Sequence, residues 1–252
     1  MLVHGLAEHS GRYGEVASFF ADADIATYAL DLPGHGKSDG IRGHIGSFEE
    51  YTDALGQLLS LAKQVHPDIP FVLLGHSMGG LIAADFLLQR QSEFVTAVLT
   101  GAAIQSPQQP SSIVLFVNRV IAAVTPRFGV LRMDASGISR DPQVVSDYEN
   151  DPLVYRGKVT AGLVTALFSA MNRVVVNAES IRLPMLIMHG SVDSLTAVEG
   201  SKLLHDTISS EDKKIVIYDG LYHEILNEPE RRKVMGDIQH WLVPRAIRDR
   251  QE

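Results

Sequence analysis

The chain has 252 residues, enough for one large domain or two small ones, and its 45% hydrophobic and 21% charged residues exclude a disordered or repeat-biased protein. Its 22 Lys and Arg residues against 30 Asp and Glu residues give a net charge of −8, which argues against a nucleic-acid partner. The absence of cysteine excludes disulfides, thiolate metal sites and a thiol nucleophile.

Short apolar runs alternate with helical patterns along most of the chain. We expect strands at residues 2–3, 25–30, 71–74, 95–100, 185–188 and 215–218. Apolar residues recur at helical spacing over residues 48–64 and 81–90. This alternation predicts βαβ units, and hence a mostly parallel sheet of at least six strands with helices on its faces.

Residues 104–180 depart from this rhythm. No run there has the length and flanking glycines of a strand, while residues 113–124 and 161–171 carry apolar residues at helical spacing. We therefore expect a helical cap over residues 104–180, inserted into a core formed by residues 1–103 and 181–252. The apolar side chains of 113–124 are interpreted as a lid that also packs on the core; plain packing is the alternative.

A candidate nucleophile lies in the run Gly75-His76-Ser77-Met78-Gly79, which is a G-x-S-x-G pattern. An expected strand precedes it and an expected helix follows, which is the context of a nucleophile elbow. So sharp a turn strains the serine backbone and requires small residues two positions before and after it. Ser77 is then expected at a helix N-terminus above the sheet; a tight turn with an incidental serine is the alternative.

A serine hydroxyl needs a base, and the chain has ten histidines. His223 is the preferred base because it follows the last expected strand across a short turn, at the same sheet edge as Ser77. Asp193 follows the preceding strand and is the preferred carboxylate to orient His223, with Asp219 as its rival. Structural roles are expected for the histidines that adjoin glycine: His4, His35, His76 and His189.

Acyl transfer places negative charge on the carbonyl oxygen of an ester, so two N–H donors are needed beside Ser77. One is expected from the backbone of Met78, directly after the nucleophile. The other is expected from Leu6, in the His-Gly loop that follows the first strand. A purely structural glycine turn is the alternative for this loop.

Motifs of one hydrolase family span nearly the whole chain. They are His4-Gly5, Glu8-His9-Ser10-Gly11-Arg12-Tyr13, Pro33-Gly34-His35-Gly36-Lys37-Ser38, Gly75-His76-Ser77-Met78-Gly79-Gly80, Asp151-Pro152-Leu153-Val154-Tyr155, His189-Gly190-Ser191-Val192-Asp193 and Tyr222-His223-Glu224. With Ser77, Asp193 and His223 in the chain order of α/β-hydrolases, the sequence resembles the monoacylglycerol lipase family of serine α/β-hydrolases. The resemblance implies the α/β-hydrolase fold with a helical cap that faces lipid, and a triad of these three residues.

The resemblance also implies a small pocket for glycerol near the serine. Glu8 and Arg12 match polar residues on the glycerol side, and Tyr148 matches a cap tyrosine close to it. A plain salt bridge is the alternative for Glu8 and Arg12. Family members usually carry further strands ahead of the His-Gly loop, so the chain is either truncated at its start or has a sheet that is short on one side.

These features predict a serine hydrolase that cleaves monoacylglycerols to fatty acid and glycerol through an acyl-enzyme, with no cofactor or metal. Lysophospholipase and short-chain carboxylesterase activities are the alternatives, and a complete triad disfavours a non-catalytic ligand-binding module. The expected partners are a lipid ester and, transiently, a membrane surface; no oligomeric state is predicted. Without a recognisable signal peptide or membrane span, a cytoplasmic protein, at most peripheral to a membrane, is expected unless the start is truncated.

Overall fold

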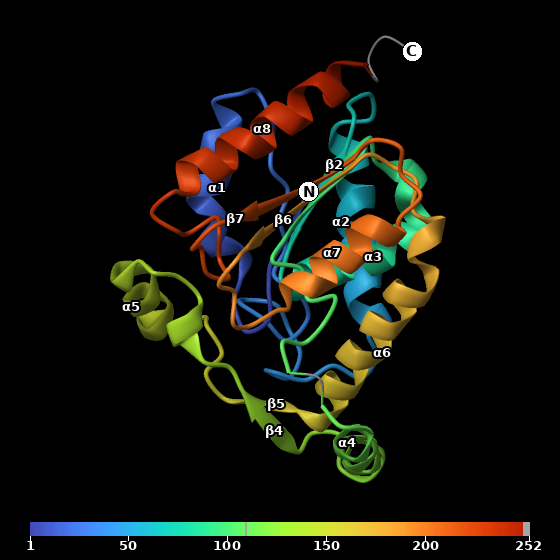
Figure 1. Ribbon diagram of the computed structural model, residues 1–252, viewed down its shortest axis with the longest axis vertical. Coiled ribbons are helices and arrows are strands. Elements are labelled where there is room, and N and C mark those ends of the chain that lie inside the picture. Colours follow the sequence, from blue (N-terminus) through green and yellow to red (C-terminus); the bar gives the residue numbers. More distant parts are fainter. Residues whose placement is uncertain (109, 249–252) are drawn as a thin grey trace.

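The computed structural model describes residues 1–108 and 110–248 (Figure 1). Its main sheet has five parallel strands in the order β1-β2-β3-β6-β7. The strands are β1 Leu2–Val3, β2 Val72–His76, β3 Thr96–Thr100, β6 Met185–Gly190 and β7 Lys213–Tyr218. The predicted α/β class with a parallel sheet is therefore confirmed.

Helices cover both faces of this sheet. They are α1 Gly14–Ala21, α2 Glu49–Val65, α3 Met78–Arg90, α7 Val198–Thr207 and α8 Arg231–Arg248, with short 3-10 turns at Ser10–Tyr13, Gln91–Glu93, Ala135–Gly137 and Ala178–Ser180. Figure 1 shows α1 and α8 together on one side of the sheet, and α2 and α3 together on the other. Each face is thereby shielded from water.

Strand residues alternate between two hydrophobic cores, one on each face of the sheet. Leu73 and Leu99 join the core that contains the buried residues of α2 and α3. Their chain neighbours Leu74 and Val98 join the core formed with α1 and α8. Because successive strand residues point to opposite faces and both faces are covered, these strands are continuous apolar runs in the sequence.

Two predictions about strands are wrong. Residues 25–30 form only one isolated bridge, between Ala29 and Leu2, because β1 is two residues long and offers no ladder to extend. Residues 104–180 contain a short antiparallel ribbon, in which β4 Gly129–Arg132 pairs with β5 Lys158–Thr160. Strands of four and three residues are too short to show alternation in a sequence.

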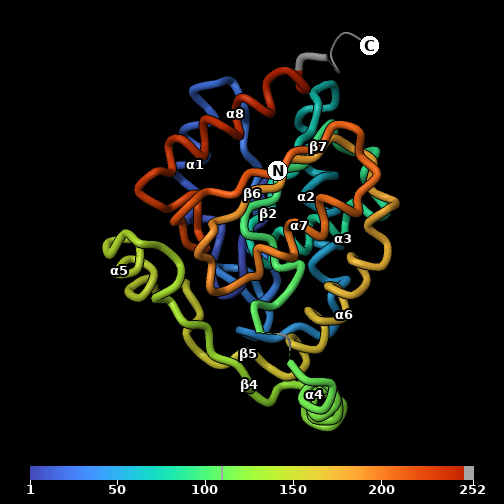
Figure 2. The backbone as a smooth tube through the Cα atoms, viewed as in Figure 1, coloured from blue at the N-terminus to red at the C-terminus, as the bar shows by residue number. Residues whose placement is uncertain are grey.

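The residues between β3 and β6 form helices as well as this ribbon. The helices are α4 Ser112–Val124, α5 Pro142–Asn150 and α6 Ala161–Asn177. Figure 2 shows α4 and the ribbon together at the lower end of the molecule, beyond the sheet, and α5 at its left edge. From this group α6 runs back along α3, and its buried Leu163 and Val174 belong to the core on that face of the sheet.

Residues Ala161–Ser180 are long and apolar enough to cross a membrane, judged by length and composition alone. Packing against α3 accounts for this apolar sequence. Arg173 of α6 also forms a two-point ion pair with Asp85 of α3, at 2.6 and 2.7 Å. These are the contacts of a core helix.

The register aligns the carboxyl ends of the strands. His76 at the end of β2 pairs with Thr100 of β3, and Thr100 pairs with Met188 of β6. Gly190 at the end of β6 pairs with Tyr218 at the end of β7. The loops after β2, β6 and β7 therefore leave the sheet at one edge, where open α/β sheets place their sites.

Candidate active site

Ser77 lies between β2 and α3 on a strained turn. Its φ of 55° and ψ of −119° are unusual for a residue with a side chain. A Cβ at Gly75 would collide with the carbonyl of Gly79, and a Cβ at Gly79 would collide with the carbonyl of Val3. The turn thus requires glycine at both positions, and it presents Ser77 at the N-terminus of α3.

The loops after β6 and β7 bring Asp193 and His223 together. His223 Nδ1 donates to Asp193 Oδ2 at 2.7 Å, and both side chains are buried. Burial lowers the pKa of His223, but the charge and hydrogen bond of Asp193 outweigh it and raise the pKa above its ordinary value. Burial raises the pKa of Asp193, but the charge of His223 and the hydrogen bonds to the carboxylate hold this pKa far below its usual range. An ionised Asp193 fixes the tautomer in which Nε2 of His223 can accept a proton.

Asp219, the rival carboxylate, lies in the turn after β7. Its Oδ1 accepts a hydrogen bond from Ser191 Oγ at 3.2 Å, and the N–H of Gly220 donates to the same hydroxyl at 2.8 Å. These contacts stabilise the turn and leave Asp193 as the carboxylate that meets the base.

Ser77 and His223 line one small cavity of about 20 Å³. Leu6 and Glu8 line it from the loop after β1, and Tyr148 of α5 lines it from the region between β3 and β6. A volume of this size is about that of one water molecule. The space in front of Ser77 is therefore narrow.

The loop after β1 passes directly beside the serine. A Cβ on Gly5 would lie 3.1 Å from Ser77 Cβ. Among the described residues, the backbone N–H groups of Leu6 and Met78 donate to no other protein group. Two unused donors next to Ser77 fit the predicted oxyanion site.

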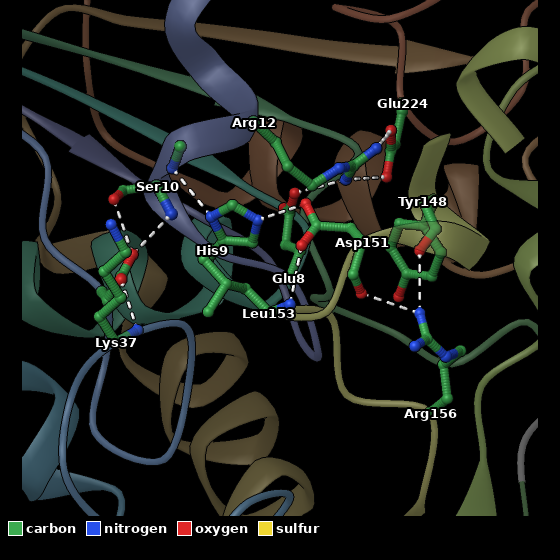
Figure 3. Close-up of polar contacts among 12 residues, drawn as sticks. Glu8, His9, Ser10, Arg12, Lys37, Tyr148, Asp151, Leu153, Arg156 and Glu224 are labelled. Atoms are coloured by element: carbon green, nitrogen blue, oxygen red, sulfur yellow. Dashed lines mark hydrogen bonds and ion pairs between the residues drawn. The ribbon is translucent and has the colours of Figure 1, made fainter. Parts of the chain in front are cut away.

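Glu8, Arg12 and Glu224 form a buried ion-pair network beside the cavity (Figure 3). Arg12 donates to Glu8 at 2.6 Å and to both oxygens of Glu224 at 2.7 Å. Glu8 Oε1 also accepts from the N–H of Gly5 at 2.6 Å and from the Tyr13 hydroxyl at 2.7 Å. Burial raises the pKa of Glu8, but the charge of Arg12 and further favourable contacts outweigh it and lower this pKa. The network thus ties the loop of Gly5 to the residue that follows the base.

Tyr148 covers this network from α5. Its ring centroid lies 4.8 Å from Cζ of Arg12, and Figure 3 shows the tyrosine beside the guanidinium group. The Tyr148 hydroxyl has no hydrogen-bond partner among the described residues. The Tyr148 carbonyl accepts from Arg156 at 3.4 Å. His9 Nε2 and Asp151 Oδ2, 2.8 Å apart, make a second link between the loop after β1 and this region.

The sequence predicts only a structural role for His189, but the structure places it against Asp193. His189 Nε2 lies 3.0 Å from Asp193 Oδ2, and both side chains are fully buried. His76 contacts Thr100 Oγ1 at 3.1 Å, as a structural residue would. The signal for His189 is its position four residues before Asp193, across the turn after β6. Within the described ranges, no group of His, Asp and Glu side chains is arranged to hold a metal ion.

Comparison with known proteins defines the class of this chain. The family model described as "Serine aminopeptidase, S33" matches residues 1–230. With the fold and the strained serine turn, this match defines a serine hydrolase of the α/β-hydrolase superfamily. The monoacylglycerol lipase of Mycolicibacterium smegmatis is 40% identical over 243 residues, which cover 96% of this chain and 87% of that protein. The chain belongs to the monoacylglycerol lipase family.

Further relatives agree with this assignment. The monoglyceride lipase of Rattus norvegicus is 32% identical over 245 residues, covering 96% of this chain and 81% of that protein. The crystal structure of Paleococcus ferrophilus monoacylglycerol lipase matches with a TM-score of 0.88 at 34% identity, covering 97% of this chain and 93% of that chain. The predicted fold, family and enzyme class, a carboxylic ester hydrolase, are thus confirmed.

Proposed function

We propose that this enzyme hydrolyses monoacylglycerols to fatty acid and glycerol through an acyl-enzyme. Ser77 Oγ attacks the ester carbonyl while His223 Nε2 takes its proton. The N–H groups of Leu6 and Met78 stabilise the oxyanion, and glycerol leaves with the proton from His223. Water then attacks the acyl-enzyme with His223 again as base, which releases the fatty acid and restores Ser77.

The observation that carries this proposal is the buried hydrogen bond between His223 and Asp193 at the cavity of Ser77. It gives the serine an oriented base in the tautomer that acyl transfer requires. The substrate class is supported by the 40% identical relative, which is a monoacylglycerol lipase. Lysophospholipids and short-chain esters suit the same triad, so the substrate is what an experiment must decide.

The polar groups of the cavity suit a small alcohol. Tyr148 and Glu8 line it, and the Tyr148 hydroxyl, which has no partner among the described residues, can donate to a glycerol hydroxyl. Arg12 is outside the cavity lining, and its guanidinium group is bound to Glu8 and Glu224. We therefore assign Arg12 an indirect role, in which it holds Glu8 in place.

Residues 104–180 are proposed to act as a cap that contacts lipid. Helix α4 has no buried residue, and its exposed apolar side chains are Ile113, Val114, Phe116, Val117, Val120 and Val124. An exposed apolar surface of this kind is typical of contact with a membrane or a protein. A cytoplasmic enzyme could use it to reach substrate dissolved in a bilayer.

The test is steady-state hydrolysis by wild type and Ser77→Ala of a monoacylglycerol, a lysophospholipid with the same acyl chain and a short-chain ester. Wild type is expected to prefer the monoacylglycerol, and Ser77→Ala to lower kcat by a factor on the order of 10⁴ to 10⁶. A preference for the lysophospholipid would overturn the proposal that monoacylglycerol is the substrate. If Ser77→Ala keeps the rate of wild type, Ser77 is not the nucleophile. An inactive wild type would favour a binding function.

A further inference from the structure

Asp193 has more hydrogen-bond partners than the orientation of one histidine requires. Its Oδ1 accepts from the backbone N–H groups of Leu195 at 2.8 Å and Thr196 at 3.0 Å. Its Oδ2 accepts from His223 Nδ1 at 2.7 Å, and His189 Nε2 lies 3.0 Å from that same oxygen. The Thr196 hydroxyl lies 2.9 Å from Oδ2 as well, so two histidines and one hydroxyl share this oxygen of the carboxylate.

Ser201 on α7 fixes which nitrogen of His189 carries the hydrogen. Its Oγ lies 2.7 Å from His189 Nδ1, and both residues are fully buried. If Nε2 carried no hydrogen, it would oppose the carboxylate of Asp193 as a second acceptor in a fully buried site, which is costly. The Ser201 hydroxyl therefore donates to Nδ1, and Nε2–H of His189 faces both the carbonyl of Thr196, at 3.4 Å, and Asp193 Oδ2, at 3.0 Å.

Rigid elements hold this arrangement. His189 belongs to β6, α7 packs against that strand, and the turn between them carries Asp193. Besides Asp193, the titratable and charged groups that face His223 are His76 of β2, whose ring centroid is 4.8 Å away, and two carboxylates, Glu224 and Glu8. These neighbours remain when His189 is replaced. An effect of its replacement therefore passes through Asp193 or through Thr196, whose hydroxyl lies 3.3 Å from His189 Nε2 and 3.4 Å from His223 Nδ1.

We propose that His189 is a positioning residue of this hydrolase, which shares Asp193 Oδ2 with His223 and so sets how strongly the carboxylate stabilises the protonated base. The inference rests on the proposed function of Ser77, Asp193 and His223. A carboxylate that accepts two hydrogen bonds on one oxygen offers less negative charge to each donor. Without His189, the backbone bonds to Oδ1 keep Asp193 in place, and protonated His223 becomes more stable.

Three variants separate these effects. His189→Leu removes the donor, His189→Gln keeps an amide N–H near the position of Nε2, and Ser201→Ala removes the group that fixes the tautomer. The readouts are kcat and KM on a soluble short-chain ester as a function of pH, and the rate at which a fluorophosphonate labels Ser77. These readouts depend on the base and its carboxylate, and they do not require the natural substrate.

His189→Leu is expected to lower kcat by up to about threefold with little change in KM, because a more stable protonated His223 gives its proton less readily to the leaving alcohol. It should also move the acid limb of kcat/KM to higher pH by about half a unit, because His223 then stays protonated to a higher pH. His189→Gln should restore both values toward wild type, and Ser201→Ala should move them in the direction of His189→Leu by less. Rescue by a neutral amide distinguishes a shared hydrogen bond from mere packing.

His35→Leu is the matched control, because His35 is also buried and its Nδ1 contacts the carbonyl of Pro33. It should lose thermal stability and keep the acid limb of wild type. The inference is overturned if folded His189→Leu keeps the kcat and acid limb of wild type, or if His189→Gln fails to rescue. If His189→Leu does not fold, an unchanged acid limb in Ser201→Ala overturns it. A wild type that fluorophosphonate does not label overturns the proposed function itself, and with it this inference.

Discussion

The carboxyl edge of the sheet, which carries Ser77, Asp193 and His223, is called the catalytic edge here. It differs from the surface of α4 in which side chains are buried. At the catalytic edge, buried charges are paired within the chain, as Arg12 is with Glu8 and Glu224. On α4 no residue is buried, and Phe116 and Val117 are 65% and 49% exposed. Buried charges without partners would be unstable, whereas exposed apolar area becomes favourable once an outside partner covers it. The catalytic edge is therefore complete in itself, whereas the apolar surface of α4 is left open for the lipid contact proposed above.

The two regions also lie apart. No residue of α4 lines the cavity at Ser77, while α5 contributes Tyr148 to it. Chemistry and the encounter with lipid should therefore respond to different substitutions.

The largest effect is expected at the catalytic edge, from Asp193→Asn. An amide in this place holds His223 in the wrong tautomer, so kcat on a soluble ester should fall by a factor on the order of 10⁴. Asp219→Asn, the matched control in the neighbouring turn, should keep the rate of wild type. An equal loss of kcat in both variants would show that Asp193 is not the particular carboxylate that orients His223.

Arg12→Met is expected to destabilise the fold through the buried ion pairs of the catalytic edge. It leaves Glu8 and Glu224 as buried carboxylates without their cation, so the free energy of unfolding should fall by about 3–5 kcal/mol. Urea denaturation measures this loss. Arg231→Met is the control because its ion pair with Glu15 is solvent-exposed, and a loss of about 1 kcal/mol or less is expected. Equal losses would mean that burial of the Arg12 network has no energetic consequence.

Local chemistry explains why the serine turn and the triad could be predicted from the sequence. Close backbone contacts require glycine at positions 75 and 79, and any turn of this kind makes such contacts. The G-x-S-x-G pattern is therefore enough to predict the shape of the turn. Asp193 and His223 each follow a strand directly, and parallel strands bring such loops to one edge. These features depend on a few neighbouring residues and on the order of the strands.

Contacts between distant segments could not be predicted in the same way. Arg12 meets Glu224 across 212 positions of the chain, and no periodicity indicates which carboxylate a buried arginine selects. His189 looked structural because its glycine neighbour was its only visible feature, while its partners on the turn and on α7 follow from packing. The short β4–β5 ribbon was missed for a similar reason, since its pairing and not its sequence makes it a sheet.

On α4, the double variant Phe116→Ser with Val120→Ser tests the other half of the comparison. Hydrolysis of monoacylglycerol in phospholipid vesicles should fall about tenfold or more, because two apolar side chains no longer enter the lipid. Hydrolysis of a soluble ester should not change. The control is Leu61→Ser with Val65→Ser on α2, where the side chains are 58% and 63% exposed. A similar loss from the α2 variant would show that exposed apolar area in general, and not α4, drives the encounter with lipid.

The smallest effect expected is on the acid limb of kcat/KM for the soluble ester. His223 must be neutral to accept the proton of Ser77, and Asp193 raises its pKa above the ordinary value of 6.5 although burial opposes this. Activity should therefore fall as the pH drops through a midpoint above 6.5, since the inactive protonated form persists to a higher pH. Rates measured from about pH 5 to pH 9 give this midpoint. A midpoint below the ordinary value would show that burial outweighs the carboxylate.

The α4 double variant should have the same midpoint as wild type, because no α4 side chain reaches the cavity. A shift of the midpoint would mean that α4 and the catalytic edge are coupled.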